Sequence, residues 1–284
     1  MVKIIEMGEI TRPATTPLTS TLFDHAEVKD IASFGLRNNE GLWPSYNCMD
    51  TLVPSPTCAD PIAPGGVYNT FVSAEWQPAF EFAVHAGVMC ASVGLNRADM
   101  EAEVRRVFAL NEAKGVEAAL VANRFVATGS GDPVQWAGAT DVTPTAPVSL
   151  PVAPALLEGY AAANYAGVPT IHMPRAAATI LADRLVWVGG KAYTLSGSKV
   201  ALGGGYDDET MLDSGKWDLY ATGEVFVERS STLDFNSFVM PGDGSGVGSD
   251  ENGLEPNTML SLVARQYRVA VDCFVAKATG TVWS

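Results

Sequence analysis

The clearest pattern of apolar and polar positions lies in residues 96–125, which we predict to form one long helix. This stretch contains no proline and is rich in Ala, Glu, Arg and Leu, and Asn96 stands where it can cap the first turn. At full length the helix would measure about 40 Å. Two apolar stripes face different ways, one before and one after Gly115: Met100, Val104, Val107 and Phe108, then Val116 and Leu120. A helix that changes its buried side in this way is expected to contact two different partners.

Shorter elements flank this helix. Period-two alternation and short apolar runs predict strands, and alanine-rich runs next to proline or glycine predict short helices. The expected strands are residues 67–72, 80–84, 170–173, a hairpin within 193–206, a strand within 219–230 with Val225 and Val227 on one side, and 267–275. The expected short helices are residues 24–34, residues 155–166 closed by Gly167, and a helix that begins at Pro174.

Two stretches near the start lack such a pattern. Residues 1–40 are rich in threonine and proline, and residues 41–66 hold five prolines between short apolar pieces. Segments of this kind bury too little apolar surface to fold alone. We expect the first to be a loose tail or an arm that orders against a neighbour, and the second to be a long extended excursion.

Length and charge limit the classes of function. A chain of 284 residues with 47% hydrophobic residues can build one large domain or two ordinary ones. The net charge is −14, and the lysines and arginines form no run, so binding to nucleic acid phosphates is disfavoured. No apolar run reaches the roughly 20 residues that span a bilayer, and the first residues do not have the order of a signal peptide. We expect a protein made and kept in the cytoplasm.

The residues with reactive side chains are scattered. Cys48, Cys58, Cys90 and Cys273 fit neither a zinc site nor a dense disulfide framework, so they are interpreted as buried thiols, with a Cys48–Cys58 disulfide as the alternative. The three histidines, His25, His85 and His172, lack a second ligand at metal-binding spacing. His172 lies in an apolar strand and is predicted to be a hydrogen-bonded core histidine rather than a catalytic one.

Glycine-rich and acidic loops are the remaining candidates for chemistry. The run GDGSGVG at residues 242–248 is followed by acids, which would repel a pyrophosphate, and is interpreted as a surface loop, with a calcium site at Asp243, Asp250 and Glu251 as the alternative. Asp207, Asp208, Glu209 and Asp213 are interpreted as a solvated loop, and Gly203 to Gly205 as a tight exit from a strand. No catalytic constellation, cofactor site or metal site emerges, so we expect a protein that is not an enzyme.

The order of these elements resembles the major capsid proteins of tailed phages with the Hong Kong 97 fold, which encapsulins share. Several stretches carry the likeness: TIHMPRAAATILADRL, TLSGSKVALGGGY, DLYATGEVFVERS and NTMLSLVARQYRVAVDCFVA. In the first half, FAVHAGVMCASVGL running into EVRRVFALNEAKGVEAAL is similar to capsid proteins of actinobacterial phages. The resemblance rests on the order of the elements and on their general pattern of residue types, and it covers residues 67–284.

This resemblance implies an α+β fold of five parts. They are an N-terminal arm at residues 1–40, an extended E-loop at 41–85, a peripheral domain at 86–140 with the long helix as its spine, an axial domain at 141–260, and a closing strand at 261–284 that returns to the peripheral domain. Lysine crosslinking is not carried over, because residues 41–85 contain no lysine.

The resemblance also implies a structural function. The chain would be a capsid subunit that assembles with identical copies into hexamers and pentamers of an icosahedral virion shell, built in the host cytoplasm around double-stranded DNA that it does not bind sequence-specifically. A scaffold, a portal and a decoration protein are further candidate partners, and no membrane is involved. Trp43, Tyr46 and Trp76 are the expected subunit contacts, with packing inside the subunit as the alternative. The rival functions are an encapsulin-like compartment and a soluble enzyme with a pocket formed by Asp207, Asp208 and His172.

Overall fold

The computed structural model describes residues 16–32, 42–45, 75–78, 80–91, 97–122, 126–127, 136, 138–165, 167–206, 214–238, 258–272 and 274–282. Several predictions concern residues outside these ranges. They are those on residues 1–15, Tyr46, Cys48, Cys58, Cys273, the strand at 67–72, the cap at Asn96, the acidic loop at 207–213 and the loop at 242–248.

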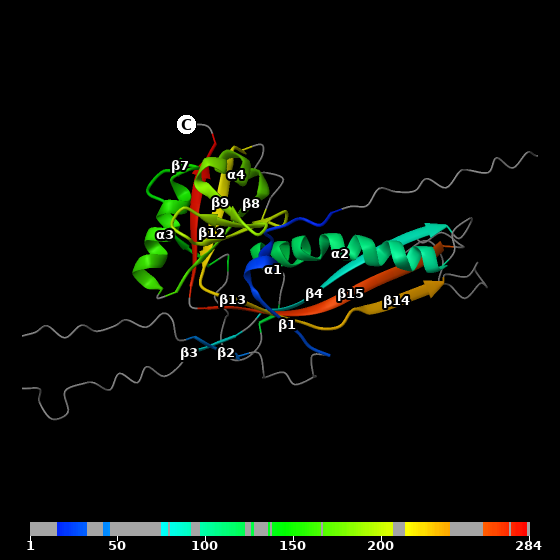
Figure 1. Ribbon diagram of the computed structural model, residues 1–284. Helices are drawn as coiled ribbons and strands as arrows, with labels where there is room; N and C mark the ends of the chain where they lie inside the picture. Colours follow the sequence, from blue (N-terminus) through cyan, green and yellow to red (C-terminus); the bar gives the residue numbers. More distant parts are fainter. Residues whose placement is uncertain are drawn as a thin grey trace, which may run out of the picture.

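The first of two large sheets has six strands and lies along the long helix (Figure 1). The strand order is β1, β13, β15, β4, β5. The sixth strand, β14, pairs with the same edge of β15 as β13 does, along the other half of that edge. Their bounds are β1 Glu27–Asp30, β4 Phe80–Ala91, β5 Val126–Ala127, β13 Val225–Arg229, β14 Leu233–Phe238 and β15 Thr258–Val271. All pairs are antiparallel except β1 with β13.

The second sheet has eight strands, in the order β6, β16, β12, β8, β11, β10, β9, with β7 also paired to β16. Their bounds are β6 Thr140–Asp141, β7 Val148–Ser149, β8 Thr170–Pro174, β9 Leu185–Val188, β10 Lys191–Thr194, β11 Lys199–Gly203, β12 Lys216–Thr222 and β16 Val275–Thr281. The hairpin predicted within residues 193–206 is confirmed as the antiparallel pair β10 and β11. The mixture of helices and sheets agrees with the expected α+β class.

The helices are few in the described residues, and α2 is the longest. They are α1 Leu22–His25, α2 Arg97–Val121, α3 Ala153–Asn164 and α4 Arg175–Ile180, followed by the short 3-10 helix Ala182–Arg184. At 25 residues α2 is about 37 Å long. The long helix is therefore confirmed, although it ends at Val121 and not at the predicted residue 125. Within the described residues, no helix combines the length and the apolar character that crossing a bilayer requires.

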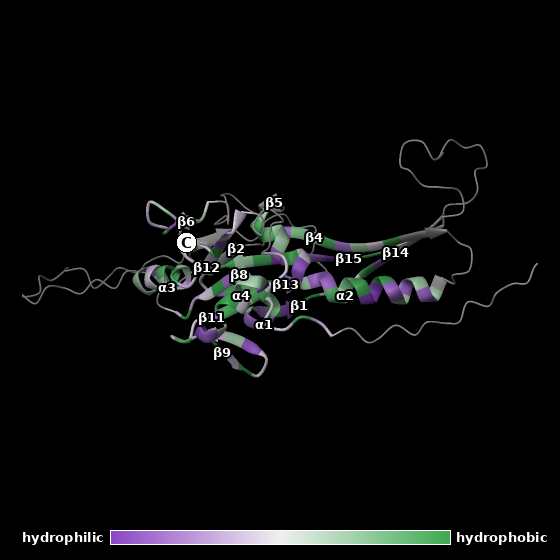
Figure 2. Cartoon of the chain, turned by 90° about the horizontal axis from the view of Figure 1, so that it is seen from above, coloured by the Kyte–Doolittle hydropathy of each residue, from purple (hydrophilic) through white to green (hydrophobic). Residues whose placement is uncertain are grey.

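The two predicted stripes of α2 are buried against different groups of residues. Val104 and Phe108 pack with Val263 of β15 and partly buried residues of β4, whereas Val116 and Leu120 belong to a second cluster. Figure 2 shows hydrophobic and hydrophilic positions alternating along α2. Both partners come from the same chain. The change of buried face is thus confirmed, and it is explained by the subunit's own sheets without a neighbouring copy.

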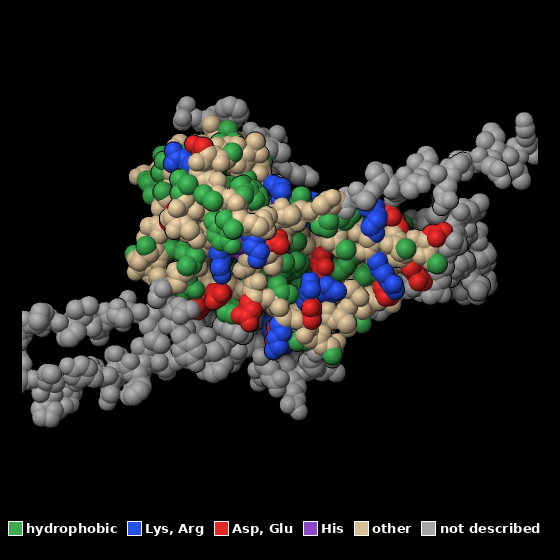
Figure 3. All heavy atoms as spheres, in the orientation of Figure 1, with side chains coloured by type: hydrophobic (Ala, Val, Ile, Leu, Met, Phe, Trp, Pro, Cys, Tyr) green, Lys and Arg blue, Asp and Glu red, His purple; other side chains and the backbone are tan. Residues whose placement is uncertain are grey.

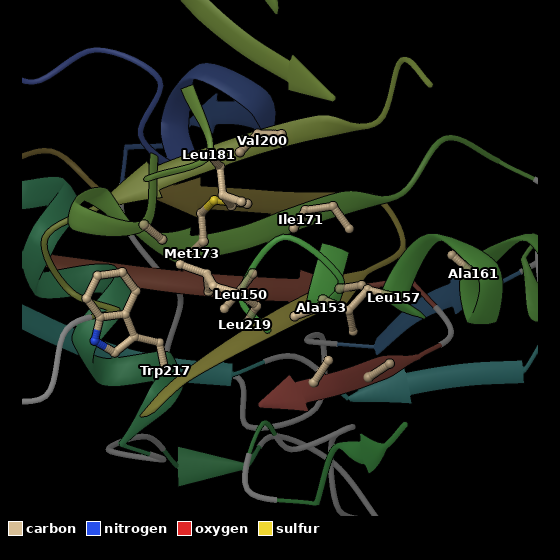
Figure 4. Packing of buried hydrophobic residues seen from close by; sticks show 14 of the residues in the cluster. Leu150, Ala153, Leu157, Ala161, Ile171, Met173, Leu181, Val200, Trp217 and Leu219 are labelled. Atoms are coloured by element: carbon tan, nitrogen blue, oxygen red, sulfur yellow. The ribbon is translucent and has the colours of Figure 1, made fainter. Parts of the chain in front are cut away.

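The main hydrophobic core lies between α3 and the eight-stranded sheet. Leu150 and Leu157 meet strand residues such as Ile171, Met173 and Leu219, all with no exposed surface (Figure 4). The helix α3 begins at Ala153 and ends at Asn164, two residues earlier than predicted at each end. Pro154 explains the shift, because proline fits the first turn of a helix, where its missing N–H is not needed.

The chain crosses between the two sheets at two adjacent points. Residues predicted as one strand at 219–230 form the end of β12 and the whole of β13, which belong to different sheets and are separated by Gly223 and Glu224. Val225 and Val227 share a buried side as predicted. Likewise, the strand predicted at 267–275 is wrong in extent, because β15 ends at Val271 and β16 begins at Val275. A Cβ on Gly223 would overlap the carbonyl oxygen of Asp272, so the two crossings are in direct contact.

The N-terminal residues differ most from the prediction. In place of a helix at residues 24–34, only Leu22–His25 is helical, and Glu27–Asp30 is a strand. The reason is tertiary: these residues gain backbone hydrogen bonds by adding a parallel strand to the edge strand β13.

Candidate assembly joint and exposed surfaces

Residues 16–32, here called the N-terminal segment, are fastened to both sheets of their own subunit. At one end β1 pairs with β13, and at the other end Ser20 bonds to the eight-stranded sheet. The Ser20 hydroxyl donates to the Val200 carbonyl at 2.8 Å and accepts from the Ala192 N–H at 2.9 Å, and the Leu202 N–H donates to the Ser20 carbonyl at 2.6 Å. Ser20 has a φ of 61°, a left-handed conformation that is uncommon outside glycine. Residues 16–32 are thus attached to their own chain, and the arm that orders against a neighbour stays a prediction.

The centre of this attachment is Glu117 of α2, which has no exposed surface. Its Oε1 accepts the backbone N–H of Leu22 at 3.1 Å, and its Oε2 accepts the backbone N–H of Gly205 at 3.1 Å. One side chain thus joins the long helix, the N-terminal segment and the turn after β11. We call this contact the joint. Burial is the main cause that raises the pKa of Glu117 to about 7, against the opposite effect of the two N–H donors and Arg175.

The glycine run at residues 203–205 belongs to the same contact. A Cβ on Gly203 would overlap the Glu117 carboxylate, and a Cβ on Gly205 would overlap the backbone of Lys114 and Ala118. These glycines do not have positive φ values, which occur at Gly189, Gly190, Gly197 and Gly215. The predicted strand exit is present, since β11 ends at Gly203. Its glycines, however, are explained by the close approach to α2 and not by backbone freedom.

Two further ionisable groups complete the joint. Arg175, the first residue of α4, donates to the Thr19 carbonyl at 2.9 Å and lies 3.4 Å from the Leu202 carbonyl. His25 is 7% exposed, its Nε2 lies 3.0 Å from the Ser20 hydroxyl, and its ring meets the edge of Tyr193. Burial and then Lys191 lower the pKa of His25 to about 4, so His25 is neutral near pH 7.

The second end of the segment is held by exposed ion pairs. Arg229 of β13 contacts Asp30 at 2.6 Å, and Lys29 contacts Glu228 at 3.4 Å. The hydrogen bond from Arg229 lowers the pKa of Asp30. Exposed pairs of this kind contribute little to stability. The backbone pairing of β1 with β13 and the buried contacts of Ser20 and Glu117 are therefore the main attachments of the segment.

Sequence reasoning did not identify Glu117. The feature of the sequence that could have identified it is its position. Glu117 is an acidic residue next to Val116 and three positions before Leu120, on the side of α2 that the apolar stripe predicts to be buried. An acid on an apolar face needs hydrogen-bond partners, and the glycine run at residues 203–205 supplies one of them from a distant part of the chain.

His172 is confirmed as a core histidine. It has no exposed surface, its Nδ1 lies 2.9 Å from the Tyr206 hydroxyl, and its Nε2 lies 2.8 Å from the Thr222 hydroxyl. Burial lowers its pKa to about 3, so the ring is neutral. Both nitrogens are used in the interior, so the enzyme hypothesis loses the histidine of its expected pocket. Asp207 and Asp208 lie outside the described residues.

The expected contact residues Trp43 and Trp76 lie in paired strands. The strands β2, Leu42–Ser45, and β3, Glu75–Pro78, form a two-stranded antiparallel ribbon, in which Trp43 is opposite Gln77 and Pro44 is opposite Trp76. The chain therefore leaves at Ser45 and returns at Glu75 in adjacent strands. The role of Trp43, Tyr46 and Trp76 in subunit contacts stays a prediction.

Exposed apolar side chains gather at the far end of the eight-stranded sheet. The outermost strand β9 presents Val186, Trp187 and Val188, which are 43%, 48% and 61% exposed. Leu195, in the turn after β10, is 72% exposed and lines a hollow of about 190 Å³ beside α3. In contrast, acidic and basic side chains alternate along α2 and the six-stranded sheet (Figure 3). Among the described residues, no group of three or more His, Cys, Asp or Glu side chains is placed to hold a metal ion.

Comparison with known proteins gives no match by sequence: neither a family model nor a curated protein matches this chain. Solved structures do match over almost the whole length. A chain of Mycobacterium phage Cain has a TM-score of 0.55 and 13% identity, and the match covers 98% of this chain and 96% of the other. A chain of Gordonia phage Cozz has a TM-score of 0.52 and 16% identity, with 97% and 91% covered.

An encapsulin has the same architecture. The chain of the holo-SrpI encapsulin complex from Synechococcus elongatus PCC 7942 has a TM-score of 0.50 and 12% identity, with 97% of this chain and 94% of the other covered. The fold expected from the resemblance, which phage major capsid proteins and encapsulins share, is thereby confirmed. The arm, the E-loop and the division into domains stay predictions.

Proposed function

We propose that this chain is the major capsid protein of a double-stranded DNA phage, a structural subunit that assembles with identical copies into an icosahedral head. The observation that carries this proposal is the agreement of fold over 97–98% of the chain with chains of two phages. An agreement of this extent includes both sheets and the long helix. It also accounts for most of the length of the matched chains, so no large additional domain separates them.

The physical character of the subunit supports a role in assembly. The apolar edge at β9 leaves Trp187 and its neighbours in contact with water, and exposed apolar groups at a sheet edge favour association with another chain. Closed shells need heterologous contacts, in which one surface of a copy meets a different surface of the next copy. We infer that copies form hexamers and pentamers, with Trp43, Tyr46 and Trp76 among the contacts between them.

The charge of the chain supports a container for DNA rather than a protein that grips it. With 18 basic and 32 acidic residues, the chain has a net charge of −14. The described ion pairs further occupy arginines such as Arg229, Arg265 and Arg268 with carboxylates of the same subunit. A wall of this kind repels phosphates over most of its surface, so we infer no sequence-specific binding of the enclosed DNA.

A shell that encloses a protein cargo is the second candidate, and the likeness to the holo-SrpI encapsulin complex favours it. The two candidate shells differ in what they enclose. Particles purified from the native source would protect DNA from nuclease in the first case, and would contain a second protein and no protected DNA in the other.

The experiment that tests the proposal is sedimentation of the purified full-length chain. We expect a discrete species far heavier than one ring of five or six copies. A sample that stays a monomer of 30.0 kDa at high protein concentration, in the presence and absence of added scaffold proteins of the native source, would contradict the proposal.

A further inference from the structure

Exposed apolar side chains surround a hollow between the start of α3 and the hairpin of β9 and β10. The hollow has a volume of about 190 Å³. In the described part of the chain nine large apolar side chains are exposed, and six of them lie in or next to the segments that form the hollow: Val152, Ile180, Val186, Trp187, Val188 and Leu195. An apolar surface of this extent around a concave site is typical of a contact with another chain.

Trp187 lies beside the hollow and does not line it. In the hairpin, Trp187 is opposite Ala192 and Leu185 is opposite Thr194. Alternate residues of a strand share one face of the sheet, so Trp187 faces the same side as Leu185 and Thr194, which line the hollow, at a distance of about 7 Å along the strand. Strand β9 lies at the margin of the molecule in Figure 2. The half-exposed indole of Trp187 is therefore available to a second chain.

The hollow has the size and the lining to receive one aromatic side chain. A cavity of about 150 Å³ lined by apolar residues can hold a benzene molecule. The apolar lining here comes from both walls: Pro151, Pro154, Ala155, Leu181, Leu185 and Leu195. Glu158 also lines the hollow, and its Oε1 accepts the hydroxyls of Thr194 and Ser196. Its Oε2 is an acceptor for the N–H of an incoming indole.

The charge of this region favours a second copy of the chain as the partner. Residues 148–198 contain two acidic and three basic residues, a net charge of +1, so the other residues carry −15 of the total of −14. The charged residues of the region are Glu158, Arg175, Asp183, Arg184 and Lys191. Two copies of an acidic chain repel each other over most of their surfaces, and least where the charge is nearly balanced. Three cations are too few for strong binding to nucleic acid phosphates.

We propose that Trp187 of one copy enters the hollow beside α3 of a second copy. Since the indole and the hollow are different surfaces of the subunit, the contact is heterologous and can repeat around a ring of copies. This inference rests on the proposed function and deepens it, because it assigns a specific contact to the assembly of the shell.

The first test compares assembly of full-length variants by light scattering at a fixed protein concentration. Trp187→Thr removes the indole, and Ala155→Phe places a ring in the hollow of its own subunit. Both replaced side chains are exposed, so far-UV circular dichroism should show an unchanged fold. We expect each variant to assemble roughly tenfold less than the unchanged chain, because buried aromatic anchors dominate many interfaces.

Two further variants make this comparison specific. Trp187→Phe keeps an aromatic side chain that can enter the hollow, so it should restore most of the assembly. Ala163→Phe adds the same ring to an exposed position of α3 that does not line the hollow, so it should assemble like the unchanged chain. An equal loss in Ala155→Phe and Ala163→Phe would contradict the role of the hollow.

The second test locates the contact directly. Benzoylphenylalanine, a photoreactive aromatic residue, replaces Trp187 in the full-length chain, and equal amounts of isotopically heavy and light copies are mixed before assembly. After irradiation, mass spectrometry should find crosslinks from position 187 to residues 151–158 that join a heavy peptide to a light one. Such mixed crosslinks arise only between copies.

The outcomes separate this inference from the proposed function. Shells that form from Trp187→Thr as readily as from the unchanged chain would overturn the inference and leave the shell function in place. Crosslinks confined to single copies, or directed to other surfaces of the second copy, would have the same meaning. An unchanged chain that stays a monomer would overturn both.

Discussion

Gly205 and Gly159 are the same residue type in very different surroundings. A Cβ on Gly205 would overlap the backbone of Lys114 and Ala118, whereas a Cβ on Gly159, in the middle of α3, would meet no atom within 4 Å. Backbone atoms of a helix cannot move aside as a flexible side chain can. The effect on stability of replacing a glycine by alanine therefore depends on which atoms lie next to it. The two positions should respond in opposite ways to the added methyl group.

We expect Gly205→Ala to destabilise the subunit by about 1–3 kcal/mol, because it overpacks the contact between the turn and α2. Gly159→Ala should stabilise it by about 0.5–1 kcal/mol, because alanine favours the helix. The measurement is the free energy of unfolding in urea. Equal effects of the two substitutions would contradict the packing at the joint.

The local pattern predicted much at the scale of residues, and long-range contacts decided the rest. His172 was identified as a core histidine because its apolar neighbours in the strand demand burial. Glu117 was missed because its two donors, Leu22 and Gly205, are 95 and 88 residues away in the chain. No local spacing reveals such partners.

At the scale of elements, the local pattern also fails to predict where the chain crosses from one sheet to the other. Period-two alternation continues through residues 219–230, so the sequence predicts one strand, yet Gly223 lets the chain pass from one sheet to the other. Tyr165, at the end of α3, connects the two crossings: it accepts the N–H of Glu224 at 3.0 Å and lies 3.4 Å from the carboxylate of Asp272. The Asp272 N–H also donates to the Glu224 carbonyl at 2.8 Å. The helix α3 therefore positions both crossings.

We expect Tyr165→Phe to destabilise the subunit by about 1 kcal/mol, because the partly buried N–H of Glu224 loses its acceptor. Tyr160→Phe is the matched control, because its ring contacts the same Phe274 at 5.8 Å, and we expect little change there. Thermal unfolding of the two variants at one protein concentration gives the comparison. A control that loses as much stability as Tyr165→Phe would show that the hydroxyl at the crossing has no special role.

At the scale of the whole molecule, the subunit combines an ion-paired sheet along a long helix with a second sheet that ends in an apolar edge. The long helix and its two stripes could be predicted from the sequence, because a period of 3.6 over many residues is a strong signal. The six-stranded sheet could not, because β1 joins it from the start of the chain and β15 from the end. The resemblance to shell proteins identified the architecture where periodicity alone could not.

The predicted contact residues can be tested at this scale. We expect Trp43→Ala and Trp76→Ala to reduce assembly at least tenfold at a fixed protein concentration, because aromatic anchors contribute most of the energy of many interfaces. The fold of the subunit, followed by far-UV circular dichroism, should be retained. Light scattering reports assembly. Normal assembly of both variants would mean that these tryptophans pack elsewhere.

The most direct test of the central claim is an electron cryo-microscopy reconstruction of the particles formed by the purified chain. We expect closed icosahedral shells of hexamers and pentamers, in which every subunit has the two-sheet fold and keeps residues 20–30 docked on its own Glu117. Particles without icosahedral symmetry, open filaments or only small soluble oligomers would contradict it.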